Sequence, residues 1–329
     1  MTDQTDSGGR RRTGADRADA PSGIVVGVDA GGSRTTAVLA AGDGTELGRA
    51  EGPGGAVRPG QAARAATAIL ETARRATAGT DVTLPVSGAV VGAAGAGRAL
   101  EREQLSAELQ AWAGLARDVR VMGDVELALH AAFGGGPGIV VAAGTGSAAV
   151  ARTPDGVLHR AGGHGWQLGD EGGGYWLGRR ALALAARDQD GVGAWTGLGV
   201  RIIRALELGS FDDLVRWAAA ATPAQVAALA PEVLRAASAG DSASRDAVRE
   251  AGLELAYLVA ALARRFAGGE PPAVAATGGL LGADSPLRTA LTDRLADMLP
   301  GSRLRSDVLD PALAAARMAL ASGSEPAGR

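Results

Sequence analysis

Two glycine-rich turns, each following an apolar run, are the parts of this sequence best suited to bind phosphate. A turn built from glycine and hydroxyl residues exposes backbone N–H groups without side-chain bulk, and such groups bind phosphate oxygens. We expect both turns, and Thr35 just after the first, to contact a nucleotide. The first turn contains Gly31, Gly32 and Ser33, and the second contains Gly144, Thr145, Gly146 and Ser147.

Two aspartates at the ends of apolar runs add acid–base and metal chemistry. Asp29 directly precedes the first turn, and a carboxylate there could hold a hydrated Mg²⁺ that bridges nucleotide phosphates. Asp124 follows another apolar run and is the candidate base for the proton of an attacking hydroxyl. A simple helix-capping role is the alternative for Asp124. Two phosphate turns, one Mg²⁺ carboxylate and one base are the parts that phosphoryl transfer from ATP requires.

The segment 162–178 combines dense glycine with Trp166, Tyr175 and an acid pair. Dense glycine is tolerated where backbone approaches a ligand closely. We expect Asp170 and Glu171 to bind the hydroxyls of a sugar, with an aromatic ring against one sugar face. The alternative is that both acids only favour a helix N-terminus. Histidine ligation of a metal is disfavoured, because His164 has no partner at a suitable spacing.

A diglycine and a dinucleotide-like pattern complete the candidate sites. Gly278 and Gly279 follow the predicted strand 273–277, where a flat adenine could lie against backbone. Gly144, Gly146 and Ala149 fit the G-x-G-x-x-A dinucleotide fingerprint. That fingerprint requires a helix to begin at the glycines, and residues 148–152 leave too little room before the next turn. The pattern therefore favours a phosphate turn between strands over a nicotinamide site.

The elements expected around these residues alternate between strands and helices and predict an α/β fold. The order of apolar strand, glycine turn, second strand and Asp-Gly turn occurs twice, at 24–44 and at 139–156, which indicates a duplicated domain. We expect strands at 24–28, 35–41, 46–51, 86–92, 119–122, 139–143, 148–152 and 273–277. We expect helices at 61–78, 100–115, 125–133, 171–186, 197–208, 211–220, 223–238 and 243–266, and a last helix that Asp310 caps with Pro311 in its first turn.

Length and composition restrict the class of protein. The chain has 329 residues, which suggests two domains, and a net charge of -3 with 3% aromatic residues, which gives no basis for binding nucleic acid. No apolar run is long enough to predict a membrane span. The lack of cysteine excludes disulfides and Cys-ligated clusters, and it fits a reducing cytoplasm. Residues 1–22 contain Arg10, Arg11 and Arg12 without a following apolar region, which is typical of a disordered tail.

The motifs resemble those of the N-acetylglucosamine kinase and BadF/BadG/BcrA/BcrD-type ATPase family, part of the actin-like sugar kinase superfamily. The resemblance covers about residues 23 to 322. It is carried by Val28-Asp29-Ala30-Gly31-Gly32-Ser33, Gly123-Asp124, Gly144-Thr145-Gly146-Ser147, Gly169-Asp170-Glu171-Gly172 with Tyr175-Trp176, and Thr277-Gly278-Gly279.

The resemblance implies two ribonuclease-H-like domains with ATP and Mg²⁺ in a central cleft, and often a homodimer. Carried over by position, Asp124 looks like the catalytic base, Gly163 and Asp170 like sugar contacts, and Gly278-Gly279 like the adenosine-side turn. The predicted domains are residues 23–123, with the helix 310–322 packed back on them, and residues 124–309 with helical additions. The implied reaction is ATP-dependent phosphorylation of a hydroxyl, the 6-hydroxyl by expectation, of N-acetylglucosamine, glucosamine or a related hexose.

Two departures from the family pattern bear on the function: the first leaves the substrate open, and the second excludes the reductase-activating relatives. The family often has a Gly-Pro-x-Asn segment that helps to hold the sugar, whereas this chain reads Gly52-Pro53-Gly54-Gly55. The missing amide puts an N-acetyl preference in question and leaves open a non-sugar acceptor. A second alternative is an ATP-binding conformational regulator or sugar sensor of the same fold. Reductase-activating ATPases of the family hold an iron–sulfur cluster through cysteine, and this chain has no cysteine.

Overall fold

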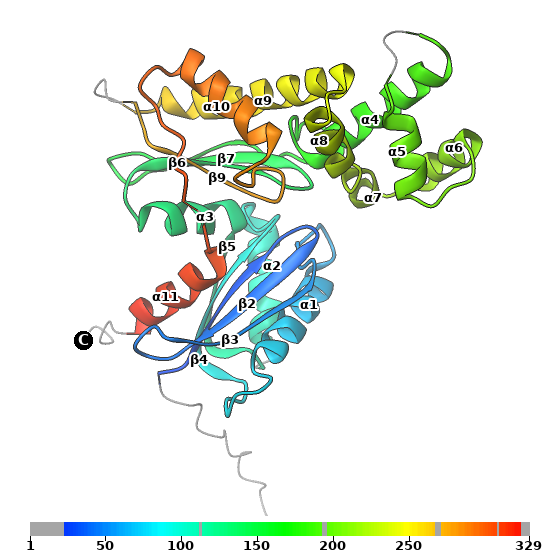
Figure 1. The fold of residues 1–329 in the computed structure, drawn as a ribbon. Coiled ribbons are helices and arrows are strands. Elements are labelled where there is room, and N and C mark those ends of the chain that lie inside the picture. Colours follow the sequence, from blue (N-terminus) through cyan, green and yellow to red (C-terminus); the bar gives the residue numbers. More distant parts are fainter. Residues whose placement is uncertain (1–22, 112–113, 193–195, 267–270, 308, 324–329) are drawn as a thin grey trace, which may run out of the picture.

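The computed structural model describes residues 23–111, 114–192, 196–266, 271–307 and 309–323, and the predicted tail 1–22 lies outside them. Two β-sheets lie one above the other, each with its own helices (Figure 1). This arrangement confirms the predicted two-domain α/β fold. The boundary that the sequence predicts at residues 123 and 124 falls between the last strand of the first sheet and the following helix, and the division into domains stays a proposal.

The first sheet has the strand order β3-β2-β1-β4-β5. Its strands β1, β2 and β3 form an antiparallel meander, and β4 and β5 run parallel to β1. Helices α1 and α2 share a core with one face of the sheet, and α11 packs on the other face. The elements are β1 (Val25–Ala30), β2 (Arg34–Ala40), β3 (Glu46–Pro53), α1 (Ala62–Ala76), β4 (Val86–Ala93), α2 (Ala99–Ala111), β5 (Ala116–Gly123) and α11 (Pro311–Gly323).

The second sheet has the order β8-β7-β6-β9, with β6, β7 and β8 antiparallel and β9 parallel to β6. It repeats the β3-β2-β1-β4 part of the first sheet, as the repeated sequence pattern predicts. The strands are β6 (Gly138–Ala143), β7 (Ser147–Arg152), β8 (Leu158–Gly162) and β9 (Val274–Thr277). The helices between β8 and β9 are α4 (Gly174–Gln189), α5 (Leu198–Ala205), α6 (Phe211–Ala220), α7 (Pro223–Ala227), α8 (Ala230–Ser238) and α9 (Ser242–Ala263), and α10 (Pro286–Met298) follows β9.

Several local predictions differ from the structure, among them the helix expected to reach residue 115, which ends at Ala111, and the strand expected from residue 119, which begins at Ala116. Strand β8 and helix α10 were not predicted, and the helix expected at 223–238 is divided into α7 and α8. Helix α4 begins at Gly174 rather than at residue 171, so Asp170 and Glu171 lie before the helix and not in its first turn. In these places tertiary packing, rather than local apolar spacing, decides where elements begin and end.

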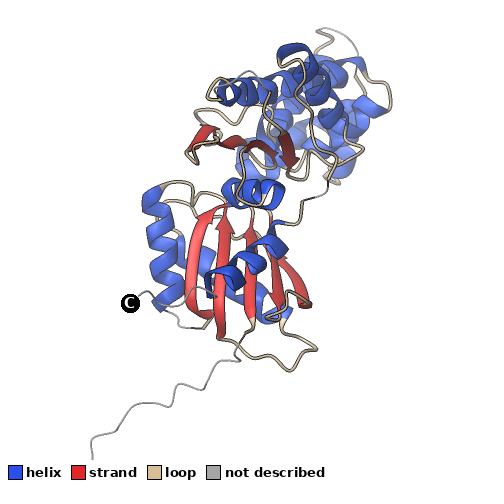
Figure 2. Ribbon diagram, turned by 90° about the vertical axis from the view of Figure 1, so that its left-hand side faces the viewer, coloured by secondary structure: helices blue, strands red, loops and turns tan. Residues whose placement is uncertain are grey.

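Helix α3 (Asp124–Phe133) joins the two halves, lying between the sheets in both views (Figure 2). Val125 and Leu129 pack with Val140 of the second sheet, whereas Leu127 on the opposite side belongs to the core that α11 shares with the first sheet. Because α3 contributes to both cores, its first residue, Asp124, has a position defined by both sheets.

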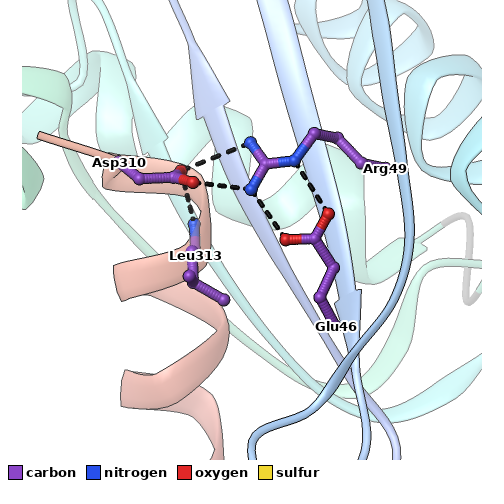
Figure 3. A network of polar contacts seen from close by, with 4 residues as sticks. All are labelled: Glu46, Arg49, Asp310 and Leu313. Atoms are coloured by element: carbon purple, nitrogen blue, oxygen red, sulfur yellow. Dashed lines mark hydrogen bonds and ion pairs between the residues drawn. The ribbon is translucent and has the colours of Figure 1, made fainter. Parts of the chain in front are cut away.

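The last helix returns to the first sheet through close packing and a polar network. A Cβ at Gly27 of β1 would lie 2.1 Å from the carbonyl oxygen of Ala312, so glycine is required where α11 crosses β1. The backbone N–H of Leu313 donates to Asp310 Oδ1 at 3.0 Å, and Arg49 donates to Asp310 Oδ2 at 2.6 Å (Figure 3). Asp310 therefore caps α11 as predicted and also ties it to β3. None of the helices in the described residues is both long and apolar enough to span a membrane.

Candidate active site

The first glycine turn connects β1 to β2 and is open to solvent. The N–H of Gly31 donates to the carbonyl of Arg34 at 2.8 Å, which closes the turn. Gly32 and Ser33 are exposed. Asp29, in the last part of β1, pairs across the hairpin with Thr36 and is half-buried. The carboxylate and the exposed turn therefore lie at the same end of the sheet.

The second glycine turn connects β6 to β7 and is supported from behind by the start of α4. The N–H of Gly174 donates to the carbonyl of Gly144 at 2.8 Å, and the N–H of Tyr175 donates to that of Thr145 at 2.9 Å. The hydroxyl of Ser147 is buried and donates to the carbonyl of Glu171 at 2.6 Å. Ser147 therefore contributes its backbone to the turn, while its side chain holds the following segment. Because β7 follows the turn, the nicotinamide alternative is excluded.

The structure brings the two turns together. The hydroxyl oxygens of Ser33 and Thr145 lie 3.2 Å apart, although the residues are 112 positions apart in the sequence. A Cβ at Gly32 would lie 3.0 Å from Thr145 Oγ1. The two glycine turns, one from each half, are thus in direct contact, while their role in binding phosphate stays a prediction.

The carboxylates of Asp29 and Asp124 lie close enough to influence each other. Burial and, to a smaller extent, the negative charges of Asp124 and Asp310 raise the pKa of Asp29 to about 7, against the opposing positive charge of Arg34. Burial also raises the pKa of Asp124, against the opposing effects of the Val125 N–H and the charge of Arg160. Gly123, rather than Asp124, is the N-cap of α3. Asp124 is therefore not the N-cap residue, although its carboxyl interacts with the N–H of Val125 in the first turn, and its role as a base stays a prediction.

Asp170 lies against the second turn in an unusual backbone conformation. Its φ of 64° is left-handed, a region that aspartate visits more readily than most residues. Burial raises the pKa of its carboxyl, and hydrogen bonds from the N–H groups of Gly165 and Ser147 oppose the rise. A Cβ at Gly146 would lie 2.2 Å from Asp170 Oδ2. Asp170 therefore contacts the second glycine turn itself, and the sugar role expected from the sequence stays a prediction.

The glycines that follow Asp170 pack on the second turn. A Cβ at Gly173 would lie 2.6 Å from the carbonyl carbon of Gly146, and one at Gly174 would lie 2.8 Å from the carbonyl oxygen of Gly144. The sequence predicts that dense glycine allows close approach of backbone to a ligand. For Gly173 and Gly174 this reason is corrected, because the backbone that they approach is that of the turn.

The remaining acceptor-side residues lie near this segment. Glu171 has an exposed side chain, and its negative charge raises the pKa of Glu254 on α9 after the larger effect of burial. Trp166 and Tyr175 have ring centroids 4.9 Å apart, and 44% of Trp166 is exposed. An exposed ring beside the glycine segment fits the predicted aromatic contact to a sugar. The roles of Gly163, Asp170 and Glu171 toward a sugar stay predictions.

The diglycine after β9 lies beside the second turn. Strand β9 is parallel to β6, with Thr277 opposite Ala142, and the N–H of Leu280 donates to the carbonyl of Ala143 at 3.2 Å. Gly278 and Gly279 are exposed, and a Cβ at Gly279 would meet no atom within 4 Å. The open space there can receive a flat ring, so the predicted adenosine contact stays compatible with the structure.

Thr35 is a correction to the predicted nucleotide contacts. Its side chain is fully buried, and its hydroxyl donates to the carbonyl of Pro53 at 2.7 Å. The hydroxyl therefore fixes the end of β3 instead of facing the turn. Gly55 is buried nearby, and a Cβ at this position would lie 2.9 Å from Thr35 Oγ1 and 3.1 Å from the Cβ of Ala30. The chain thus packs backbone where the family often has an asparagine.

Arg160 and Gly97 are site residues that the sequence analysis missed. Arg160 lies on the unpredicted strand β8, and its side chain reaches Gly97, in the loop between β4 and α2 of the first sheet. No pattern in the sequence indicated this contact, because β8 is short and Gly97 lies in a small-residue loop.

The donor set at the turns fits Mg²⁺ held together with nucleotide phosphates. Mg²⁺ usually keeps several waters and binds one or two carboxylates plus phosphate oxygens. The negative charge of Asp124 contributes to the raised pKa of Asp29, so a cation bound beside Asp29 would stabilise its ionised form. Among the described residues, no group of three or more His, Cys, Asp or Glu side chains is arranged to hold a metal ion without further ligands. Asp29 is therefore the residue suited to hold a phosphate-bound Mg²⁺.

A cavity of about 480 Å³ lies elsewhere, at the β4–β5 side of the first sheet between α2 and α11, and none of its lining residues belongs to the two turns. Hydrogen-bond donors and carboxylates that could act on a phosphate gather instead at the turns. We therefore place the candidate active site at the contact between the two halves.

Comparison with known proteins identifies the family. Residues 26–319 match the model of the BadF/BadG/BcrA/BcrD ATPase family, and the chain belongs to this family. The N-acetyl-D-glucosamine kinase of Dictyostelium discoideum is 26% identical over 311 residues, which cover 90% of this chain and 98% of that protein. The N-acetylmuramic acid/N-acetylglucosamine kinase of Clostridium acetobutylicum is 33% identical over 174 residues, which cover 52% of this chain and 56% of that protein.

Solved structures agree with the family assignment. A Chromobacterium violaceum protein provisionally named an N-acetylglucosamine kinase has a TM-score of 0.74 and 31% identity, covering 90% of this chain and 98% of that one. A ROK family glucokinase from Streptomyces griseus, with a TM-score of 0.59 and 21% identity over 90% of this chain and 99% of that one, shares the fold. The predicted family and fold are confirmed, and with them the predicted class of enzyme, an ATP-dependent sugar kinase.

Proposed function

We propose that this chain transfers the γ-phosphoryl group of ATP to a hydroxyl of N-acetylglucosamine, glucosamine or a related hexose. We expect the acceptor to be the 6-hydroxyl. The observation that carries the proposal is the contact between the two glycine turns, with Asp29 and Asp124 at the same junction. Backbone N–H groups from two turns can bind phosphates, and a carboxylate beside them can accept the acceptor's proton. The site thus offers the positioning and charge arrangement that phosphoryl transfer needs.

Each group has a proposed task. The turns 31–33 and 144–147 bind the phosphates, Gly278-Gly279 lies against the adenosine side, and Asp124 accepts the proton of the acceptor hydroxyl. Asp29 holds Mg²⁺, which when bound would neutralise phosphate charge. Asp170, with Gly163 and Glu171, orients the sugar. A raised pKa of Asp124 in the free chain is compatible with this task, because a base works best when its pKa approaches the working pH.

The acceptor is proposed from two considerations. The relatives from Dictyostelium discoideum and Clostridium acetobutylicum are named for N-acetylglucosamine, and the latter also for N-acetylmuramic acid. Trp166 offers an exposed ring in the same glycine-rich segment as Asp170, a combination that suits a sugar with one apolar face. Gly55 supplies no amide, so we expect weaker discrimination for the N-acetyl group. A homodimer and a cytoplasmic location, where ATP is supplied, complete the proposal.

A panel assay tests the reaction. ADP release is measured with ATP, Mg²⁺ and, separately, N-acetylglucosamine, glucosamine, N-acetylmuramic acid, glucose and a non-sugar hydroxy acid. We expect stimulation by an amino sugar, with phosphate found on one hydroxyl by NMR. Slow ADP release that no acceptor stimulates would contradict the kinase and favour the sugar-sensing regulator.

Replacement of the proposed base tests the mechanism. Asp124→Asn should lower kcat by at least about a hundredfold, as expected when general-base catalysis is lost, while ATP binding measured by calorimetry is retained. Glu126→Gln, which changes a half-buried acid two residues further along α3, is the matched control and should keep normal turnover. Normal turnover in the Asp124 variant would contradict the assignment.

A further inference from the structure

Arg160 places a guanidinium group at the acceptor side of the junction. The residue belongs to β8, the outer strand of the second sheet, and is exposed. Its Nε donates to the carbonyl of Gly162 at 3.2 Å, and its Nη2 donates to the carbonyl of Gly163 at 3.1 Å. Both glycines have left-handed φ values, 71° and 70°. The guanidinium thus fixes the backbone bend that begins the glycine-rich segment.

The same guanidinium reaches the other half of the molecule. A Cβ at Gly97 would lie 2.0 Å from Nη1 of Arg160, and the two next nearest atoms, at 3.3 and 3.9 Å, also belong to Arg160. Gly97 in turn packs against Gly123, where a Cβ would lie 3.3 Å from the Cα of Gly97. Gly123 directly precedes Asp124. Arg160 therefore connects the acceptor-side segment to the loop that supports the proposed base.

Charge at the junction agrees with this placement. The positive charge of Arg160 acts on Asp124 and also on Asp170, lowering the pKa of each against a larger rise from burial. A guanidinium offers several donors in a fixed plane, so it can hold two carbonyls and still direct a third nitrogen elsewhere. The charge of Arg160 thus acts on both proposed site acids, and its side chain contacts residues of both halves of the chain.

We propose that Arg160 is a positioning residue, which holds the Gly162–Gly163 backbone against the Gly97 loop and so sets the acceptor relative to Asp124. The proposal deepens the proposed function and rests on it for its kinetic tests. If Arg160 only fixed the backbone bend at Gly162 and Gly163, its replacement would destabilise β8. The effect of that replacement would then not depend on the residue at position 97 in the first half. The contact with Gly97 therefore distinguishes the two roles.

A double-mutant cycle tests the coupling. In Gly97→Ala the added methyl group and Nη1 of Arg160 cannot both keep their places, and the backbone of Gly97 is not left-handed, so alanine itself is acceptable there. Gly97→Ala and Arg160→Ala should each lower kcat/KM for the sugar by about tenfold or more, because small displacements of reacting groups are costly. The double variant should equal Arg160→Ala alone, because the methyl group then meets no arginine.

Binding measurements separate positioning from loss of structure. The apparent KM for the sugar should rise and kcat should fall in Arg160→Ala, while ATP affinity measured without sugar stays within about twofold, since Arg160 donates its hydrogen bonds to Gly162 and Gly163 and not to residues of the turns 31–33 and 144–147. Arg160→Lys keeps the charge without the planar fork and should recover only part of the loss. Arg249→Ala, an exposed arginine of α9 paired with Asp246, is the matched control and should behave as wild type.

Two outcomes would overturn the inference. One is additive losses in the double variant, and the other is a catalytically active wild type whose Arg160→Ala variant has unchanged sugar KM and kcat. The melting temperatures of the wild type, the two single variants and the double variant test the Arg160–Gly97 contact independently of enzyme activity. If the wild type phosphorylates no acceptor, the proposed function fails, whereas a non-additive pattern of melting temperatures still supports the Arg160–Gly97 contact and an additive pattern rejects it.

Discussion

The two glycine turns have the same place in their sheets but different surroundings. Asp29 and Ala142 are each the fifth residue of the first strand of their hairpins. The first turn thus has a carboxylate beside it and exposes Gly32 and Ser33. The second has alanine instead, and it is supported by the N–H groups of Gly174 and Tyr175.

This difference indicates a division of tasks between the halves. Binding and release of a metal-bound phosphate require a negatively charged ligand for the metal and a site open to solvent. The first turn provides both, through Asp29 and the exposed Gly32 and Ser33. The second turn has no carboxylate in the place of Asp29, and its bonded carbonyls keep its N–H groups in a fixed direction, which favours preorganised binding of an anion. We infer that the first turn supplies charge and the second supplies fixed geometry, and three substitutions test this comparison.

The largest expected effect is at the charged turn. Asp29→Asn should lower kcat/KM for ATP by at least about a hundredfold, because it removes the carboxylate beside the phosphates. Thr145→Ala at the second turn should cost about tenfold or less, because a neutral hydroxyl contributes one modest hydrogen bond. Steady-state kinetics over a range of Mg²⁺ concentrations measure both. Equal losses at the two turns would contradict the proposed division.

Stability without nucleotide provides the control for Asp29→Asn. The folded-state pKa of Asp29 is about 7, above its ordinary 3.8, so the folded chain holds the proton more tightly than the unfolded chain. The wild type therefore loses stability as the pH rises from about 4 to 7, and the neutral asparagine does not. At pH 8 in EDTA the variant should melt at a higher temperature than the wild type, which would show that its inactivity is not misfolding.

The next effect is at the second turn, which the carboxylate of Asp170 contacts. Asp170→Asn should lower kcat/KM by about ten- to a hundredfold, because the carboxylate accepts charge-assisted hydrogen bonds from the N–H groups of Ser147 and Gly165. Since Ser147 belongs to the phosphate turn, affinity for ATP should fall together with affinity for the sugar. Calorimetry with ATP alone measures the first part. A change confined to the sugar would mean that Asp170 is only an acceptor contact.

Local sequence patterns were sufficient to predict the hairpins that carry both turns. In β1 and β6 the apolar run, the glycine turn and the second strand are contiguous, so the glycine positions and the carboxylate at 29 could be read directly. The repeated order also predicted two similar sheets. The helix cap at Asp310 was equally local, because aspartate followed by proline is itself a start signal.

The remaining features depend on contacts between distant segments. Arg160 acts through Gly97, which is 63 positions away, and no local pattern marks such a pair. Thr35 has a hydroxyl and directly follows the turn, so the sequence suggests a nucleotide contact. The register of β3, however, places the Pro53 carbonyl against this hydroxyl, and the Thr35 side chain is buried. Gly173 and Gly174 are required by the carbonyls of the second turn, which only the folded chain brings near. Sequence identified the chemistry, and packing decided which residues perform it.

The smallest expected effect concerns helix α11, which comes from the end of the chain and packs on the first sheet. Asp310 caps α11 and pairs with Arg49, which is itself paired with Glu46. Asp310→Ala removes cap and ion pair and should lower the free energy of unfolding by about 1–2 kcal/mol. Asp310→Asn keeps a good cap and removes only a partly exposed ion pair, so it should cost about 0.5 kcal/mol. Urea denaturation measures both, and kcat should stay near that of the wild type.

The pH dependence of this loss identifies its origin. Burial acts to raise the pKa of Asp310, but hydrogen bonds from Arg49 and Leu313 outweigh it and hold the pKa below 3.8. A carboxyl with a lowered folded-state pKa stabilises the fold above its unfolded pKa, and this contribution disappears as the pH falls through the folded value. The difference between the wild type and Asp310→Asn should therefore be constant from pH 8 to pH 5 and shrink below about pH 3.8. A difference that persisted unchanged in acid would assign the effect to packing of α11 instead of to the Arg49–Asp310 pair.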